Sequence, residues 1–390
     1  MFTERLYYSD SYLTAFDAEV VDLSDDGKIV YLERTAFYPS SGGQPNDLGT
    51  LNGERVLDVL DQDSRIAHVL SGPIQAGRVR GIVDWDRRFS HMQQHTGQHL
   101  LSAVFQELLG APTLSFHLGP EVSTVEIGAK SLIDKQLEDV EARANQIVWE
   151  ARPVSIQFED ASTAEGLRKA SARTGTLRII AISGFDRSAC GGTHVRSTAE
   201  IGAIQIRGLE KIRGNVRIEF ACGMRAVRAA RADFRLLSEV SRTVALPPLE
   251  LPAAIQGMRD RLRDSEKETA KLRGELARQE GLSLYASTPE GAGGLRRAFL
   301  SRPVLDETVR ACAAAFVTGK RAIALAAAEQ GGAVLLAASS DSGIDAGRTL
   351  KACFARHGGR GGGSAQLAQG SFDNPEMLSY LREELGFRGN

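Results

Sequence analysis

The chain has 390 residues, of which 42% are hydrophobic and 25% charged, and its formal net charge at pH 7 is −2. This length and composition are typical of a globular protein with two to four domains. No apolar run approaches the 18 residues of a membrane-spanning helix. The four cysteines show no disulfide-scaffold spacing and no signal peptide is recognisable, so a cytoplasmic protein is expected. Nucleic-acid binding stays open, because a basic patch can lie within a neutral total.

Residues 1–84 are predicted to form a small β-barrel. Short alternating stretches such as KIVYLERTAFY and RVRGIVDW are separated by the turn signals DDG, NG and SGP. The segment 35–49, TAFYPSSGGQPNDLG, is too rich in glycine, serine and proline for a strand. It is either a plain hairpin loop or a flexible loop that presents a hydroxyl, Thr35, and a carboxamide, Gln44, toward a site.

Residues 87–109 are predicted to form a helix that carries two histidines, His95 and His99, in the motif HTGQH. Because they are four residues apart, they lie on one helix face. Cys190 and His194 follow in CGGTH, where a Gly-Gly turn lets a thiolate come close to an ion. Two imidazoles, one thiolate and a fourth ligand predict a tetrahedral zinc site with one ion per chain.

Two further residues, His91 and Thr96, limit which metal ligands and which kind of enzyme the motif can indicate. His91 lies about 12 Å of helix axis from His99, at ~1.5 Å per residue. One ion cannot reach both at zinc–nitrogen distances of about 2 Å, so His91 is assigned to the surroundings of the site or to the surface. Zinc peptidases carry a glutamate base in H-E-x-x-H, whereas Thr96 occupies that position here. The motif therefore argues against a peptidase.

Residues 85–230 mix helix and strand. An extended stretch, LSFHLGPEVSTVEI, is followed by a helix over about 134–150 and by the four strands VSIQFED, TLRIIAI, GAIQIRG and NVRIEFACG. CGGTH falls between the second and third of these strands. The charge-dense residues 231–281, with a break at 246–252, predict a helical hairpin or coiled-coil arm, or else a solvated linker helix.

Residues 282–390 are predicted to form an α/β unit, because Ala-rich helices alternate with buried runs such as RAIALAAAE and GAVLLAAS. The segment 355–370, ARHGGRGGGSAQLAQG, is expected to be either a flexible loop or a loop whose backbone amides face a phosphate backbone. A modest basic patch in or just before it is formed by Arg348, Lys351, Arg356 and Arg360.

Four motifs, FYPSSGGQPNDLG, HTGQHLLSA, CGGTHV and RIEFACGMRA, resemble in their order the editing domain of alanyl-tRNA synthetases. HTGQH, in place of the HTATH usual in synthetases, is more similar to the free-standing AlaX editing proteins. The resemblance covers about residues 1–240, and the arm and glycine-rich unit extend it to the long form of AlaX. It implies an α+β fold with a barrel over 1–84, a zinc-containing editing domain of the second-additional-domain type over 85–230, an arm over 231–281 and a C-terminal α/β domain over 282–390.

The resemblance implies a trans-editing deacylase, a carboxylic ester hydrolase that acts on mischarged Ser-tRNA(Ala), with Gly-tRNA(Ala) as a second candidate. An alanine pocket rejects serine poorly, because one added hydroxyl costs little. The chain begins at the barrel and has no Asp-His-His motif, so neither aminoacylation nor phosphoesterase chemistry is expected. The alternative is a zinc-stabilised tRNA-binding module without hydrolysis.

The resemblance also implies roles for single residues. Thr35 matches a residue tied to discrimination between serine and alanine, and Gln44 matches one tied to activity. The metal ligands are matched by His95, His99, Cys190 and His194. Whether zinc is catalytic, orients the substrate or is structural stays open. The C-terminal basic patch implies tRNA contacts, and a homodimer through the arm or the C-terminal domain is the other role considered for these parts.

Overall fold

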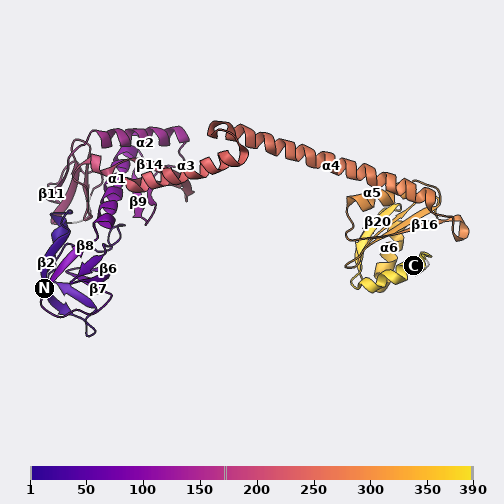
Figure 1. Ribbon diagram of the computed structural model, residues 1–390, viewed down its shortest axis with the longest axis horizontal. Helices are drawn as coiled ribbons and strands as arrows, with labels where there is room; N and C mark the ends of the chain where they lie inside the picture. The colour runs from indigo at the N-terminus through magenta and orange to yellow at the C-terminus, as the bar shows by residue number, and fades with distance from the viewer. Residues whose placement is uncertain (1, 171, 173, 388–390) are drawn as a thin grey trace. The chain divides into compact units, whose positions relative to one another are not determined.

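The computed structural model describes residues 2–170, 172 and 174–387 (Figure 1). The chain divides into two compact units, residues 1–244 and 245–390. Both contain helices and strands, so the predicted α+β class is confirmed. In this described part of the chain, no helix has the length and apolar character needed to cross a membrane.

The first unit begins with a six-stranded sheet that closes on itself in the order β2-β3-β7-β6-β5-β8. Buried and exposed residues alternate along β8, as the sequence pattern predicts for a barrel wall. A short parallel pair, β1 (Glu4–Arg5) and β4 (Arg34–Thr35), lies outside this sheet. The barrel strands are β2 (Ala15–Leu23), β3 (Ile29–Leu32), β5 (Gly49–Leu51), β6 (Glu54–Gln62), β7 (Arg65–Leu70) and β8 (Arg78–Val83).

The metal-binding motif lies on α1 (Trp85–Leu109), which follows the barrel directly. Asp84 caps the helix by accepting a hydrogen bond from the Arg87 amide, and Gly110 ends it in the left-handed conformation with φ of 60°. Apolar residues of α1 and of α2 (Asp134–Trp149) pack on a four-stranded antiparallel sheet. In the order of the sheet, its strands are β14 (Ile204–Ile212), β15 (Asn215–Cys222), β10 (Ser123–Ile127) and β9 (Thr113–Leu118).

A three-stranded antiparallel sheet carries the second ligand motif. It comprises β11 (Val154–Asp160), β12 (Thr176–Ile182) and β13 (Asp186–Ala189). β13 is absent from the sequence prediction, which counts four strands after α2 instead of five. Because β13 ends at Ala189, CGGTH begins directly at a strand end and is held by the sheet. The unit ends with α3 (Met224–Val244).

A fully buried ion pair joins the barrel region to α1. The guanidinium of Arg88 contacts the carboxylate of Asp47, with Nε 2.9 Å from Oδ2, and both side chains are inaccessible to solvent. Arg88 also donates to the backbone carbonyls of Ser11 and Ala36. A buried pair of this kind is tolerated when its remaining hydrogen-bonding groups are satisfied, as they are here.

The second unit begins with the long helix α4 (Leu251–Ser287), which continues past the predicted boundary at residue 282. Its last turns pack on α5 (Glu307–Phe316), and a Cβ at Gly281 would lie 2.2 Å from the carbonyl oxygen of Cys312. The five-stranded sheet has the order β16 (Arg296–Arg302), β17 (Ala322–Ala328), β18 (Ala333–Ala338), β20 (Leu367–Ser371) and β19 (Arg360–Gly363). The remaining helices are α6 (Ala346–His357) and α7 (Leu378–Glu384), and short 3-10 turns lie at Leu6–Tyr8, Thr198–Ile201, Pro248–Glu250, Ala292–Gly294 and Pro375–Met377.

The expectation of a flexible glycine-rich loop over 355–370 is wrong, because half of this segment forms the antiparallel pair β19–β20 and its first three residues are the end of α6 (Ala346–His357). The reason is close packing of Phe354 from α6. A Cβ at Gly361 or Gly370 would lie 2.7 or 2.4 Å from its ring. Glycine is therefore needed for the approach of the helix to the sheet, although it disfavours strands in general.

Candidate metal centre

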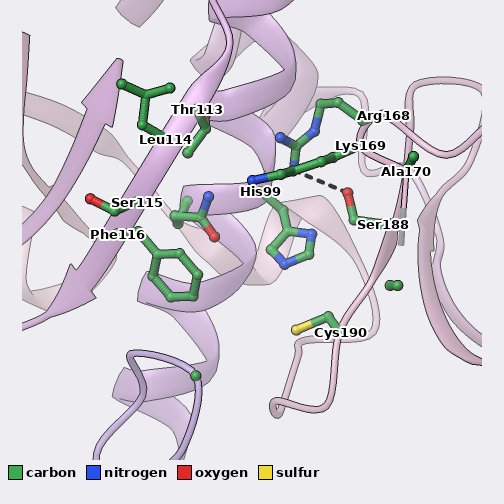
Figure 2. Close-up of a pocket in the computed structure, with 13 residues that line it drawn as sticks. His99, Thr113, Leu114, Ser115, Phe116, Arg168, Lys169, Ala170, Ser188 and Cys190 are labelled. Atoms are coloured by element: carbon green, nitrogen blue, oxygen red, sulfur yellow. Dashed lines mark hydrogen bonds between the residues drawn. The ribbon is translucent and has the colours of Figure 1, made fainter. Parts of the chain in front are cut away.

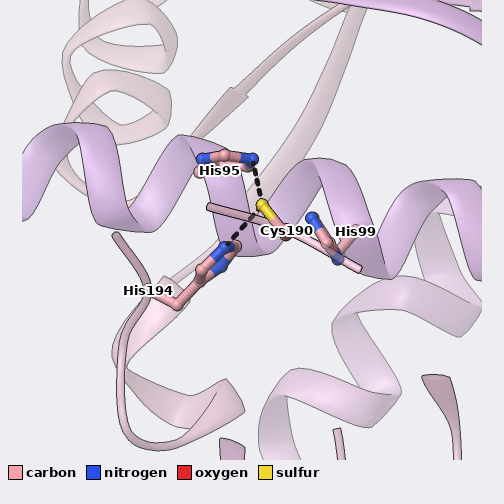
Figure 3. A group of neighbouring side chains, drawn as sticks. All are labelled: His95, His99, Cys190 and His194. Atoms are coloured by element: carbon pink, nitrogen blue, oxygen red, sulfur yellow. Dashed lines mark hydrogen bonds between the residues drawn. The ribbon is translucent and has the colours of Figure 1, made fainter. Parts of the chain in front are cut away.

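The four predicted ligands, far apart in the sequence, lie together in the structure (Figure 3). One donor atom from each of His95, His99, Cys190 and His194 lies within 4.8 Å of the others. The Nε2 atoms of His95 and His194 are each 3.4 Å from the sulfur of Cys190. Three imidazole nitrogens and one sulfur are a donor set that suits a tetrahedral transition-metal ion. These residues could therefore hold a metal.

Gln44 holds the ring of His95 in the orientation that a metal ligand needs. Its Oε1 lies 2.8 Å from Nδ1 of His95. An amide oxygen only accepts hydrogen bonds, so the ring proton lies on Nδ1 and the Nε2 lone pair faces Cys190. Gln44 also donates to the hydroxyl of Thr193 and accepts from its amide. Outer partners of this kind fix the tautomer of metal-binding histidines.

The other two imidazoles have similar outer contacts. Nδ1 of His194 lies 3.1 Å from the hydroxyl of Thr96, the residue that stands where a peptidase has its glutamate. Nδ1 of His99 lies 3.5 Å from the carboxylate of Asp186. Asp186, on β13, is in turn bound by Arg168. The rings of His95 and His194 thus each have one nitrogen hydrogen-bonded outside the group, whereas Nδ1 of His99 faces a carboxylate without a hydrogen bond.

The charges of the group favour a bound cation. Burial raises the pKa of Cys190, but His95 and His194 outweigh this effect and bring the thiol pKa well below its usual value. Burial lowers the pKa of His99, whereas contacts with Asp186 and Cys190 raise it to about 9. The carboxylate of Asp186 is paired with Arg168, so the buried thiolate of Cys190 is left to be compensated by one further positive charge, which a proton on His99 or a metal ion can provide.

The turn that carries Cys190 is held by Arg178. One guanidinium nitrogen, Nη1, donates to the carbonyls of Cys190 and Gly192 over 2.7 and 2.9 Å. Nε donates to the carbonyl of Tyr8. Gly192 passes so close to the site that a Cβ would lie 2.2 Å from the ring of His95. The glycine predicted to ease the approach is therefore required at this position.

A cavity of about 460 Å³ lies beside the metal-binding group (Figure 2). His99 and Cys190 form part of its wall, so the group is reached from this side. β9 residues lie on one side of the labelled group, and Arg168–Ala170 with Ser188 lie on the other. The lining comprises Gly42, Gln98, His99, Thr113, Leu114, Ser115, Phe116, Arg168, Lys169, Ala170, Ser188, Ala189 and Cys190.

Comparison with known proteins shows which protein families the chain is similar to. Residues 177–219 match the "Threonyl and Alanyl tRNA synthetase second additional domain", and residues 308–386 match the "DHHA1 domain". The chain is 34% and 32% identical, over 96% and 97% of its length, to the alanine–tRNA ligases of Methanoregula boonei and Archaeoglobus fulgidus, but spans only 42% and 44% of these enzymes. It is 32% identical to the alanyl-tRNA editing protein AlaX-L of Pyrococcus horikoshii, with 96% of both chains covered.

The chain belongs to the AlaX-L family. The resemblance found in its motifs is thus confirmed. Two sequence-predicted positions of this AlaX-L family member, Thr35 and His91, belong neither to the metal-binding group nor to the cavity lining. Thr35 is fully buried, with its hydroxyl 2.8 Å from Nε2 of His68, and it accepts a hydrogen bond from the Phe37 amide. His91 lies on α1 and is buried, which excludes the surface alternative of its assignment and leaves that of a residue in the surroundings of the site. Burial, followed by the charge of Arg87, lowers its pKa to about 3.

The predicted basic patch lies in the second unit of this AlaX-L family member. Arg348, Lys351 and Arg356 are exposed on α6, and Arg360 is exposed at the start of β19. Arg356 forms an ion pair with Glu384 at 2.7 Å, which offsets part of the patch's positive charge. Whether the patch binds tRNA stays a prediction.

Sequence reasoning missed several residues around the metal-binding group. Asp186 and Arg168 were missed because β13 was not predicted, and Arg178 because it is twelve residues from the turn that it holds. Gln98 stands inside HTGQH and could have been singled out by its place beside His99.

Proposed function

We propose that the protein is a trans-editing aminoacyl-tRNA deacylase. Its substrate is Ser-tRNA(Ala), with Gly-tRNA(Ala) second, and its site contains one zinc ion held by His95, His99, Cys190 and His194. The observation that carries this proposal is the position of the three-histidine, one-cysteine group at the wall of a cavity of about 460 Å³. The full-length similarity to a protein named for alanyl-tRNA editing supports it.

The residues of the chain have separate tasks in this proposal. Gln44 and Thr96 keep imidazole nitrogens directed at the zinc ion. The zinc, when bound, supplies positive charge that can orient or polarise a substrate group. The walls of the cavity hold the ester and restrict water. Among the described residues, no carboxylate lines the cavity. In this proposal the attacking water is held by nearby polar groups and not by the glutamate base of a peptidase.

Selection of serine follows from polar contacts. A synthetase pocket made for alanine discriminates weakly against one additional hydroxyl. An editing site that provides a hydrogen-bond partner for this hydroxyl can favour serine and spare alanine. We assign that role to Thr35, whose hydroxyl is held in a fixed orientation by His68.

The arm and the C-terminal part are included in the same proposal. We assign Arg348, Lys351, Arg356 and Arg360 to contacts with the tRNA body, and we retain the division into parts 1–84, 85–230, 231–281 and 282–390. Dimerisation through the arm or the C-terminal part is the alternative. An editing factor that follows aminoacylation is expected in the cytoplasm.

Release of serine from Ser-tRNA(Ala) by catalytic amounts of protein tests the proposal, with Gly-tRNA(Ala) and Ala-tRNA(Ala) run in parallel. Multiple turnovers on the seryl ester, slower turnover of the alanyl ester and about one zinc per chain are expected. Cys190→Ala should abolish turnover and zinc binding, whereas Cys222→Ala, a buried cysteine outside the group, should do neither. Stoichiometric protection of the ester would instead favour a tRNA-binding module.

A further inference from the structure

A buried carbonyl oxygen at the cavity wall has no hydrogen-bond partner among the described residues. Gln98 is 3% exposed and lines the cavity next to His99. Within the described residues, its carbonyl oxygen Oε1 accepts no hydrogen bond. Buried polar atoms are nearly always paired, so an unpaired acceptor at a cavity wall points to a donor supplied by a ligand.

The other end of the same carboxamide is anchored. Nε2 of Gln98 donates to the hydroxyl oxygen of Ser102 over 2.7 Å, and Thr113 donates to the same oxygen over 2.6 Å. Ser102 thus receives two hydrogen bonds, which occupy its acceptor sites. This arrangement fixes the amide plane and leaves Oε1 as the free group.

The surroundings of Gln98 indicate the kind of ligand. His99 and Cys190 place the metal-binding group at one part of the wall. Leu114 and Phe116 contribute apolar surface, and Arg168 and Lys169 contribute positive charge. A ligand that matches these features carries a reactive polar group, a flat ring and an anionic group. The aminoacylated 3′-terminal nucleotide of a tRNA has all three.

We propose that Gln98 is a specificity-determining residue whose Oε1 accepts a hydrogen bond from a donor on the aminoacyl-ribose part of the substrate. The donor is the α-amino group, the serine hydroxyl or the ribose 2′-hydroxyl, each of which can donate a hydrogen bond to a carbonyl oxygen. The inference rests on the proposed deacylase function for the identity of the ligand. The anchored amide and its unpaired oxygen are independent of that function.

The test measures equilibrium binding of a non-hydrolysable analogue, adenosine 5′-monophosphate with a 3′-seryl amide in place of the ester. Gln98→Leu removes the acceptor and should weaken binding about tenfold, the value of one hydrogen bond. Gln98→Glu keeps an oxygen at the position and should recover part of the affinity. Gln106→Leu, an exposed position on the same helix, is the matched control. Zinc content should be unchanged in all three variants.

Three trimmed analogues identify the donor. The alanyl analogue lacks the side-chain hydroxyl, the 3-hydroxypropanoyl analogue lacks the amine, and the 2′-deoxy analogue lacks the ribose hydroxyl. The analogue that lacks the donor to Gln98 should be bound equally well by the full-length wild type and by Gln98→Leu. Equal losses for all four compounds, no loss for any of them, or no binding of the seryl analogue by the wild type would overturn the assignment.

Failure of the deacylase proposal gives a different result. A wild type that binds the analogue with the expected dependence on Gln98, yet releases no serine from Ser-tRNA(Ala), refutes hydrolysis and leaves the role of Gln98 intact. If Gln98→Leu does not fold, Gln98→Met takes its place, since methionine has a similar length and lacks a strong acceptor.

Discussion

The carboxamide oxygen of Gln44 lies 2.8 Å from Nδ1 of His95, and the same side chain is hydrogen-bonded to both the hydroxyl and the amide of Thr193. One residue of the segment 35–49 therefore links α1 to the turn that carries Cys190 and His194. The two ligand motifs are held in register through a side chain that contributes no ligand itself.

Replacing Gln44 by Leu should lower zinc affinity by about 10- to 100-fold, because loss of an outer partner frees the ring of a ligating histidine. Competition with a chromogenic chelator gives the affinity. Gln106→Leu, on the exposed side of α1, should bind zinc as the wild type does. Unchanged affinity in Gln44→Leu would show that the loop does not orient His95.

Gly97 is packed against Cys222, and a Cβ at Gly97 would lie 2.3 Å from the sulfur. Gly97→Ala should destabilise the protein by about 1–3 kcal/mol through overpacking. Cys222→Ala in the same chain should relieve most of this cost, which chemical denaturation of the single and double variants measures. Gly274→Ala, an open helical position on α4, should be neutral or slightly stabilising. Additive effects in the double variant would contradict the proposed clash.

His68 should make stability depend on pH. Burial lowers its pKa to about 4, whereas the unfolded chain has the ordinary value of 6.5. Between these values only the unfolded state takes up the proton, so stability is lost as pH falls, by up to about 1.4 kcal/mol per pH unit. In His68→Gln this part of the slope should disappear from urea unfolding measured between pH 7 and 4.5. His117→Gln, an exposed histidine, should leave the slope unchanged.

Thr35→Val should reduce discrimination between Ser-tRNA(Ala) and Ala-tRNA(Ala) by roughly three- to tenfold. Nδ1 of His68 lies 3.1 Å from the Val30 carbonyl and therefore carries the proton, so the Thr35 hydroxyl donates to Nε2. Its oxygen accepts from the Phe37 amide and has one further acceptor site, which we assign to the serine hydroxyl. Thr35→Ser keeps the hydroxyl and is the control. The ratio of the two deacylation rates is the readout, and equal ratios in both variants would refute the role.

Removal of residues 245–390 should raise KM for Ser-tRNA(Ala) more than it lowers kcat and should flatten the salt dependence of KM. The cut is placed at the boundary of the compact units, because α4 continues through residue 287. Arg360→Ala should reproduce more of the loss than Arg356→Ala, whose charge is paired with Glu384. A change from dimer to monomer in sedimentation, with KM unchanged, would support dimerisation instead.

The sequence predicted the parts of the site that depend on local spacing. His95 and His99 follow from the helical period, and Cys190 and His194 from a short motif with two glycines. Asp186 and Gln98 do not, because their roles depend on a four-residue strand and on a cavity that only the folded chain creates.

The fold followed a similar division. The alternation of apolar and polar residues was sufficient to predict β8. In contrast, the sequence predicts a loop at β19, because glycine has little intrinsic preference for strands. What makes Gly361 suitable there is the ring of Phe354, a tertiary contact that no local pattern records.

The buried pair of Arg88 and Asp47 has a consequence for inheritance. The cation belongs to the metal-binding helix and the anion to the loop of the barrel region, and neither is accessible to water. A recombination event that joined this helix to a foreign barrel would leave a guanidinium buried without its counter-ion, at a cost of about 3–5 kcal/mol. The barrel and the metal-binding domain should therefore be transferred together when gene segments recombine.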